Sequence, residues 1–161
     1  MAVVNVIVAG LGGQGVIKAS EILADAACRA GHDVKKAEVH GMSQRGGSVT
    51  TDVRFGDEVL SPMVPSGEAD YLVVLAPSEV SVTQSSLRPG GVLIGPDFVA
   101  ESSLPNRRSL NVALLGALSH HLELPEDAWM GALAAALPER LLEVNRQAFR
   151  LGRLAAQERA R

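Results

Sequence analysis

Cysteine is almost absent from this 161-residue chain, which contains only Cys28. One thiol cannot close an internal disulfide, and it cannot hold an iron–sulfur cluster, which takes about four thiolates. Cys28 falls on the apolar side of the first expected helix, so we predict a buried, unreactive thiol. With 47% hydrophobic and 20% charged residues, the composition indicates an ordinary globular protein that binds no cluster of its own.

Aromatic residues, excess positive charge and long apolar runs are also scarce. Five scattered aromatic residues make no base-stacking platform, and a formal charge of −3 argues against a broad phosphate-binding face. The opening MAVVNVIVAG has no basic start, and its apolar run is too short for a signal peptide or a membrane span. We therefore predict a cytoplasmic protein with no nucleic-acid or membrane partner, built as one domain over residues 1–161.

The hydrophobic pattern predicts strands and helices that alternate early, with helices dominating late. A strand over 3–9, a helix over 14–30 stopped by Gly31 and a strand over 33–39 form a βαβ unit. Further strands are expected at 48–55, 58–62, 70–75 and 92–94, with a turn at 88–91, and helices at 77–86, from 111, after Pro125 and from Pro138. Strands 48–55 and 58–62 would pair as a hairpin. The fold class is α/β: a Rossmann-like open, mostly parallel sheet with a β-hairpin and C-terminal helices.

A glycine-rich turn joins the first strand to the first helix. Its sequence fits G-x-G-x-x-G, in which glycines allow a tight turn, close approach of a ligand and close helix–strand packing. The free N–H groups at the helix start favour an anion. Glu38, at the end of the second strand, stands where a ribose-binding carboxylate would support NAD binding. The alternative is a turn shaped by packing against a neighbouring subunit. The candidate binding residues are Gly10, Gly12, Gly13, Gln14 and Gly15.

The segment HGMSQRGG follows the second strand and gathers unusually varied polar groups. Arg45 could hold a phosphate or carboxylate with two hydrogen bonds, and His40 could act as an acid or base. We expect this segment at the same sheet edge as the glycine-rich turn, where open α/β sheets bind ligands. An ordered turn bonded to its own backbone is the alternative. The candidate residues for substrate, coenzyme or partner binding are His40, Gly41, Met42, Ser43, Gln44, Arg45, Gly46 and Gly47.

The two motifs together resemble a known family. AGLGGQGVIKASEILADAACRAGHDV, AEVHGMSQRGGSVTTDVRFG and SPMVPSGEADYLVVL are similar to the gamma-type subunit of 2-oxoacid:ferredoxin oxidoreductases. The similarity is greatest to the beta subunit of the indolepyruvate type. NVALLGAL and EVNRQAFRLG extend the resemblance into the late helices, so that it covers nearly the whole chain.

The resemblance implies a subunit without cofactors, inactive by itself, that works beside a larger subunit. That partner would carry thiamine diphosphate, magnesium and 4Fe-4S clusters. The complex would decarboxylate an aryl 2-oxoacid, form its acyl-CoA from coenzyme A and reduce ferredoxin. In agreement with this division, Gly56-Asp57 is followed by Glu58, so the chain lacks the GDG of a thiamine diphosphate motif. A stand-alone NAD(P)-binding oxidoreductase and a nucleotide-sensing module remain the alternatives.

The sequence departs from the family pattern at PDFVAESSLPNRRSLNV, which is compact where relatives carry a longer segment. The shortening could trim an interface or a coenzyme contact. Among the remaining candidates, His120-His121 is expected to be a helix-terminal pair rather than a metal site, because no further ligand has matching spacing. Asp70 is expected to cap the entry to a strand rather than to act as a catalyst.

Overall fold

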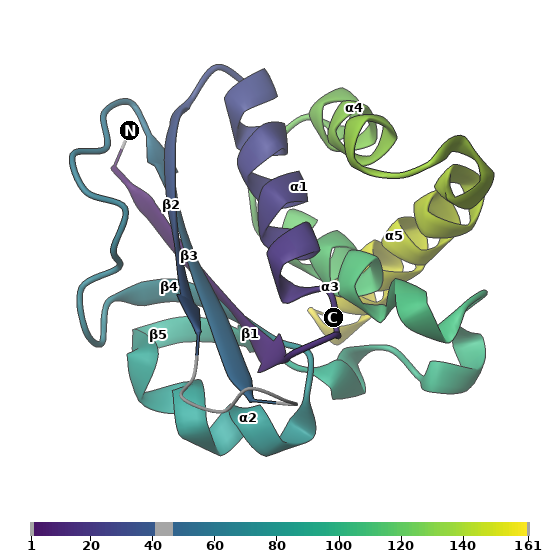
Figure 1. Cartoon of the computed structure of the whole chain (residues 1–161), viewed down its shortest axis with the longest axis horizontal. Helices are drawn as coiled ribbons and strands as arrows, with labels where there is room; N and C mark the ends of the chain where they lie inside the picture. The colour runs from purple at the N-terminus through teal and green to yellow at the C-terminus, as the bar shows by residue number, and fades with distance from the viewer. Residues whose placement is uncertain (1, 41–46, 161) are drawn as a thin grey trace.

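The computed structural model describes residues 2–40 and 47–160 and shows five strands and five α-helices within them (Figure 1). The strands are β1 (Val4–Leu11), β2 (Asp33–His40), β3 (Ser48–Gly56), β4 (Ala69–Val74) and β5 (Leu87–Ile94). The helices are α1 (Val16–Arg29), α2 (Pro77–Thr83), α3 (Leu110–Ser119), α4 (Glu126–Ala136) and α5 (Glu139–Arg159), with short 3-10 turns at 84–86, 96–98, 101–103 and 107–109. The predicted α/β class is confirmed.

The strands form one sheet in the order β2-β3-β1-β4-β5. β4 is parallel to β1 and β5 is parallel to β4, whereas β3 is antiparallel to both of its neighbours. β2 therefore runs in the direction of β1, and β3 alone among the described strands runs the other way. The carboxyl ends of β1, β2, β4 and β5 consequently lie at one edge of the sheet, which is the lower edge in Figure 1.

Helices cover the two faces of the sheet unequally (Figure 1). α1 and α3 lie on one face, and α4 and α5 pack behind them. The main core lies between these layers, where Val6 and Val8 of β1 meet Ile22 of α1 and Leu115 of α3. On the opposite face, a smaller apolar cluster lies beneath α2 and the segment 57–68. None of the described helices is both long and apolar enough to cross a lipid bilayer.

The predicted boundaries of α1 follow from its sequence. Apolar residues at helical spacing face the core, and Ala19, Ile22 and Ala26 are fully buried or nearly so. The helix stops where Gly31 takes a left-handed φ of 92°. The N–H of His32 then donates to the carbonyl of Ala27, which satisfies one of the last helical acceptors.

Two glycines allow α3 and α5 to cross in backbone contact. A Cβ atom on Gly116 would lie 1.9 Å from the carbonyl oxygen of Phe149, and one on Gly152 would lie 1.6 Å from that of Ala113. Such distances cannot exist between real atoms, so only glycine fits at either position. The crossing fixes how the start of α3 sits against the start of α5, which matters for the site described below.

Two predictions about the sheet are wrong, and the βαβ unit is split. Residues 58–62 form no strand, and β3 instead pairs with β2 and β1, so the hairpin partner of β3 is β2. Its two ladders leave β3 no free side for 58–62, and Pro62 has no N–H to donate. β3 also separates β1 from β2, so the two parallel strands of the expected βαβ unit are not neighbours. The expected turn at 88–91 lies inside β5, where the ladder with β4 is irregular and Gly90 has a φ of 81°.

Candidate functional site

The glycine-rich turn is held from inside by a side chain of its own. Between β1 and α1, Gln14 folds back so that its Oε1 accepts the N–H of Leu11 at 2.8 Å. Its Nε2 donates to the carbonyl of Leu75 at 3.4 Å, which ties the turn to the end of β4. A Cβ atom on Gly10 would lie 2.9 Å from Gln14 Oε1, so Gln14 occupies the space that this glycine opens. Gln14 is thus a structural part of the turn.

The last glycine of the turn, Gly15, contacts Asn111, a residue that no sequence motif singled out. Gly15 has a left-handed φ of 83° and precedes the first residue of α1. Asn111, at the start of α3, donates from Nδ2 to the carbonyl of Gly15 at 3.2 Å and accepts the N–H of Val112 at Oδ1. A Cβ atom on Gly15 would lie 2.5 Å from Asn111 Nδ2. Helix α3 therefore holds the residue that precedes α1 in place through Asn111.

The chain on both sides of HGMSQRGG lies at the edge predicted for it. Ser48 is opposite Leu11 in the ladder between β3 and β1, and the N–H of Gly12 donates to the carbonyl of Gly47 at 3.0 Å. Ser48 Oγ also donates at 2.8 Å to Glu79 Oε2 of α2, a carboxylate that is only 6% exposed. The candidate residues Gly41, Met42, Ser43, Gln44, Arg45 and Gly46, and the side chain of His40, lie outside the described residues.

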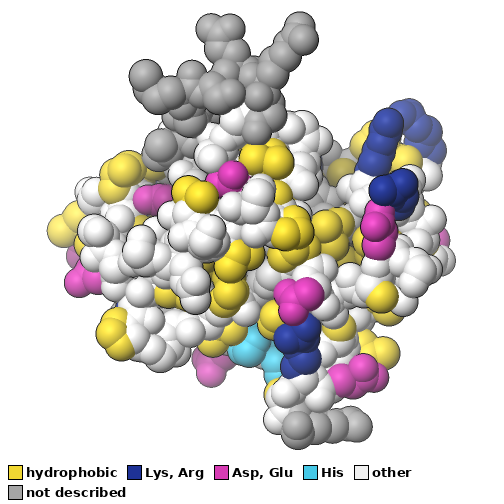
Figure 2. Space-filling view, turned by 90° about the horizontal axis from the view of Figure 1, so that it is seen from below, with side chains coloured by type: hydrophobic (Ala, Val, Ile, Leu, Met, Phe, Trp, Pro, Cys, Tyr) yellow, Lys and Arg dark blue, Asp and Glu magenta, His cyan; other side chains and the backbone are white. Residues whose placement is uncertain are grey.

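A cavity of about 580 Å³ opens beside the turn. Gly13, Gln14 and Gly15 of the turn contribute to its lining, as do Arg107 and Arg108. Leu75, Glu101, Leu110 and Asn111 complete its walls. Figure 2 looks onto this edge of the sheet; basic side chains gather at one flank, next to an acidic one, and hydrophobic or uncharged atoms cover most of the middle.

The two arginines of the cavity differ in their partners. Arg107 forms an ion pair with Glu101. The guanidinium of Arg108 has no hydrogen-bond or ion-pair partner within 2–40 and 47–160, although its backbone N–H donates to Asn106 Oδ1 at 2.9 Å. An unpaired guanidinium that lines the same cavity as the glycines at a helix start is suited to bind an anionic group. Both arginines belong to the compact segment 96–112, in which no sequence motif singled out either of them.

Glu38 does not occupy the position that a dinucleotide fold requires. It lies on the edge strand β2, and β3 stands between it and the glycine-rich turn at the end of β1. Its carboxylate forms an ion pair with Lys36 at 3.2 Å, two residues back on the same strand. The insertion of β3 thus separates the two halves of the dinucleotide fingerprint, and the NAD(P) interpretation is not favoured.

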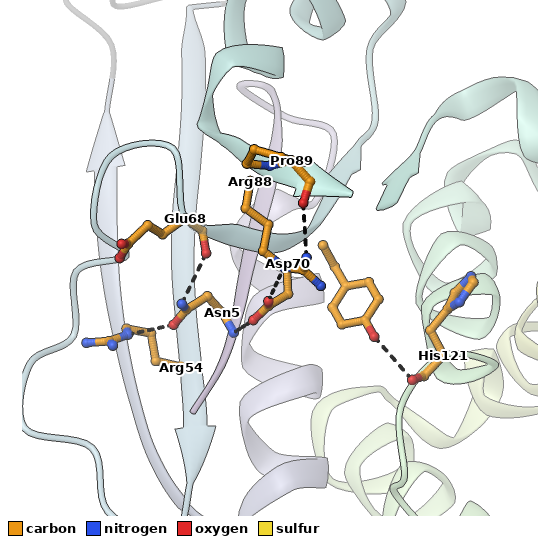
Figure 3. A network of polar contacts seen from close by, with 8 residues as sticks. Asn5, Arg54, Glu68, Asp70, Arg88, Pro89 and His121 are labelled. Carbon is orange, nitrogen blue, oxygen red and sulfur yellow. Dashed lines mark hydrogen bonds and ion pairs between the residues drawn. The ribbon is translucent and has the colours of Figure 1, made fainter. Parts of the chain in front are cut away.

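The opposite edge of the sheet carries a closed polar network (Figure 3). Asp70 accepts the N–H of Asn5 at 2.8 Å through one oxygen and Arg88 Nε at 2.7 Å through the other. Asn5 in turn accepts Arg54 Nε at 2.8 Å and donates to the carbonyl of Glu68 at 3.1 Å. The network links β1, β3, β4 and β5, so Asp70 has a structural role at the start of β4.

Two groups near this network have perturbed acidities. Burial lowers the pKa of His121, and the neighbouring His120 lowers it further. Burial has the opposite effect on the phenol of Tyr71 and raises its pKa. The Tyr71 hydroxyl donates to the carbonyl of His121 at 3.4 Å. The histidine pair follows the end of α3 as predicted, with its rings edge to face at 5.1 Å. Nowhere in the described ranges do three His, Cys, Asp or Glu side chains meet in an arrangement that could hold a metal ion.

A carboxyl with a shifted pKa, that of Asp52, lies on the face of the sheet beneath the segment 57–68. Burial raises the pKa of Asp52, although the N–H of Val64 and the charge of Arg54 oppose that shift. Asp52 Oδ2 accepts the Val64 N–H at 2.9 Å, which anchors the segment to β3.

Cys28 is exposed, so the prediction of a buried thiol is wrong. It follows Ala26 and Ala27 but falls off the stripe by which α1 faces the core.

Sequence comparisons extend over nearly the whole chain. Residues 5–100 match the family described as pyruvate ferredoxin/flavodoxin oxidoreductase. The indolepyruvate oxidoreductase subunit IorB of Thermococcus kodakarensis is 33% identical over 194 aligned positions, covering 96% of each chain. Because 194 positions exceed the 161 residues here, that relative carries residues that this chain lacks.

Comparisons with solved structures agree. The gamma subunit of the keto/oxoacid ferredoxin oxidoreductase of Geobacter sulfurreducens PCA superposes with a TM-score of 0.82 at 25% identity, over 96% of this chain and 99% of that one. The 2-oxoglutarate:ferredoxin oxidoreductase of Magnetococcus marinus, at 22% identity, shares the fold, with a TM-score of 0.84 over 98% of this chain and 32% of that one.

Fold and site together define a Rossmann-like α/β domain with a glycine-rich turn and a basic cavity at one sheet edge. The chain belongs to the pyruvate ferredoxin/flavodoxin oxidoreductase family, whose curated members similar to it are subunits of 2-oxoacid oxidoreductases.

Proposed function

We propose that this chain is the small, cofactor-free subunit of a 2-oxoacid:ferredoxin oxidoreductase of the indolepyruvate type. The complex would decarboxylate an aryl 2-oxoacid oxidatively, transfer the acyl group to coenzyme A and reduce ferredoxin. The observation that carries the proposal is the 33% identity to an indolepyruvate oxidoreductase subunit along nearly the full length of both chains. The whole of 1–161 would act as one domain within that complex.

The redox cofactors do not fit the residues of this chain. Cys28 is its single cysteine, and a 4Fe-4S cluster needs about four thiolates. We therefore assign thiamine diphosphate, magnesium and the clusters to a larger partner subunit, because such cofactors carry the redox chemistry themselves. No step of the oxidation is assigned to a residue of this chain.

The role proposed for this chain is to complete a coenzyme and substrate site from one side. Gly10, Gly12, Gly13, Gln14 and Gly15 would shape the loop nearest to the shared active site, with free N–H groups at the start of α1 facing the phosphates of coenzyme A. Arg108, unpaired in the same cavity, would supply a positive charge that attracts these phosphates. His40, Ser43, Gln44 and Arg45 would contact the partner subunit, the oxoacid or the coenzyme, and Gly41, Met42, Gly46 and Gly47 would shape the backbone between them.

Coexpression with the thiamine-binding subunit tests the proposal. The two chains should copurify, and the complex should reduce an artificial dye with indolepyruvate and coenzyme A faster than with pyruvate. Arg45→Ala should weaken association or dye reduction. The proposal fails if the chains never associate and Arg45→Ala changes nothing.

Titration of the isolated chain with NADH, followed by fluorescence, tests the disfavoured alternative. Absence of binding at millimolar NADH is expected, because β3 separates Glu38 from the glycine-rich turn. Saturable binding of NADH would instead favour the interpretation that the chain binds dinucleotides.

A further inference from the structure

The two faces of the sheet differ in what covers them. Helices α1, α3, α4 and α5 lie on one side, whereas α2 is the one helix of the described residues on the other side (Figure 1). The segment 57–68, which contains neither helix nor strand, crosses that second side. We call the surface formed by residues 57–68 and 77–86 the α2 face.

Large hydrophobic side chains are exposed on the α2 face. The described part of the chain has four exposed large hydrophobic side chains, and three of them belong to this face: Leu60 at 84% exposure, Met63 at 51% and Val82 at 63%. Val64 of the segment and Val80 of α2 pack against the same small apolar cluster, which places the two elements side by side. Single exposed apolar residues are ordinary, but a group on one surface marks an interaction site.

The segment 57–68 is held in a fixed conformation, although it has no regular structure of its own. Side chains of β2 and β3 bond its backbone at three points: the N–H of Val59 donates to Asp33 Oδ2 at 2.8 Å, Arg54 Nη1 donates to the carbonyl of Ser61 at 2.8 Å, and the N–H of Val64 donates to Asp52 Oδ2 at 2.9 Å. Val59 is buried while Leu60, the next residue, points outward. A partner would therefore meet apolar side chains that are already ordered, which favours tight binding.

The α2 face also has charge of one sign. Its residues include Asp57, Glu58, Glu68 and Glu79, and all 15 Lys and Arg residues of the chain lie outside 57–68 and 77–86. Glu58 and Glu68 are exposed, whereas Glu79 is buried. Arg54, which reaches the segment from β3, offsets only part of this charge. A protein surface that covers the α2 face must therefore bring positive charge around its own apolar patch.

A second copy of this chain does not match the α2 face. A two-fold contact places the same patch on both sides of the interface. Glu58 and Glu68 would then approach the acidic residues of the other copy, and like charges brought together in an interface oppose association. The α2 face is therefore suited to a different chain.

We propose that the α2 face is the surface by which this chain docks on the larger, thiamine-binding subunit. The matching patch of that subunit would be apolar, with Lys and Arg at its rim. Leu60 and Met63 would be buried in the contact, and Glu58 and Glu68 would face the basic rim. This inference rests on the proposed function for the identity of the partner.

Binding of the purified full chain to the immobilised thiamine-binding subunit tests the apolar part of the inference. Leu60→Ser should weaken the affinity about tenfold, because a buried apolar anchor is lost from the contact. Leu154→Ser is the matched control, since Leu154 is also exposed but belongs to α5, on the other side of the sheet. It should bind as the wild type does. Thermal melts of both variants show whether they remain folded.

Charge reversal tests the acidic part. Glu58→Lys combined with Glu68→Lys should slow association about tenfold at low ionic strength, and added salt should reduce the difference from the wild type. Glu158→Lys, which changes an exposed acidic residue of α5, should leave the association rate close to that of the wild type.

Amide hydrogen exchange of the wild-type complex gives a readout without variants: exchange in 57–68 and 77–86 should become slower than in the free chain. The inference is overturned if Leu60→Ser and Leu154→Ser bind equally well, if the two charge changes have equal effects, or if exchange on the α2 face stays the same. Dimerisation of the free chain that Leu60→Ser abolishes would also overturn it, because a second copy would then be the occupant. A wild-type chain that never binds the thiamine-binding subunit would contradict the proposed function itself, and this inference with it.

Discussion

The two edges of the sheet use charged residues in opposite ways. At the amino ends of β1, β4 and β5, Asp70 and Arg88 are joined with Asn5 in a closed network (Figure 3). At the carboxyl ends of the same strands, Arg108 lines a cavity beside the glycine-rich turn, and its guanidinium has no partner among the described residues. Charges that satisfy one another hold the strands together, whereas a charge left without a partner on a cavity is available to a ligand. We call the edge at the amino ends the structural edge and the edge at the carboxyl ends the binding edge. What distinguishes them is whether their charged residues are paired, rather than which residue types they contain.

The glycine crossing of α3 and α5 holds the helix whose first residues line the cavity at the carboxyl ends of the strands, so disturbing it should have the largest effect. Gly152→Ala places a methyl group 1.6 Å from the carbonyl oxygen of Ala113 and forces the helices apart. We expect a loss of about 3 kcal/mol or more in the free energy of unfolding, at the upper end of overpacking effects. Chemical denaturation of the purified chain measures it.

Gly131→Ala is the matched control in α4. A Cβ atom there would meet only the flexible end of Arg29, at 2.8 Å, and alanine favours the helix by about 1 kcal/mol over glycine. Its stability should therefore stay close to that of the wild type. Equal losses for both variants would show that the close crossing has no special role.

Asp70→Ala should weaken the structural edge alone. The change removes the acceptor for the Asn5 N–H and for Arg88 Nε, and the partly exposed site limits the cost to about 1–2 kcal/mol of stability. Affinity for coenzyme A, measured by calorimetry on the folded variant, should stay within twofold of the wild type. A large loss of affinity would show that the two edges are coupled.

The smallest effect should be a pH dependence at the structural edge, carried by His121. Its pKa is lowered in the folded state by burial and by His120, whereas the unfolded chain takes up a proton near the ordinary pKa of about 6.5. Stability is therefore complete above that pH and falls as the pH decreases through it. Because solvent reaches the ring, the loss between pH 7.5 and 5.5 should be below about 1 kcal/mol.

His121→Gln tests this dependence, because glutamine does not titrate. Urea unfolding at pH 7.5 and 5.5 should show a smaller difference for the variant than for the wild type. An unchanged or larger difference would place the loss on acidification in another group. Asp52 could not supply it, because its raised pKa acts with the opposite sign: ionised Asp52 costs stability above its folded pKa.

The features of this structure that could be predicted from the sequence are the local ones. The glycine-rich turn, α1 with its stop at Gly31, and the meeting of the turn with the ends of the HGMSQRGG segment all follow from short motifs and from the direction of parallel strands. Strand order did not follow, because the insertion of β3 between β1 and β2 depends on pairing between distant segments. That single insertion removes the dinucleotide interpretation, although the fingerprint and Glu38 are both present.

The candidate site was predictable only where its residues are close in sequence. Asn111 supports Gly15 from 96 residues away, and no local pattern distinguishes it. Arg107 and Arg108 are adjacent in the sequence, but only the fold shows that Glu101 pairs with Arg107 and leaves Arg108 without a partner among the described residues. Cys28 was misplaced because it was assigned to the apolar side of α1, although it falls off the stripe of residues that faces the core.

The most direct test compares one arginine from each edge in the complex with the thiamine-binding subunit. Arg108→Gln should raise the KM for coenzyme A about tenfold, the loss of roughly one charge-assisted bond pair, while the melting temperature stays near that of the wild type. Arg88→Gln should lower the melting temperature and leave that KM unchanged. If Arg108→Gln leaves the KM for coenzyme A unchanged, or Arg88→Gln raises it as much, pairing does not separate the two edges and the account is wrong.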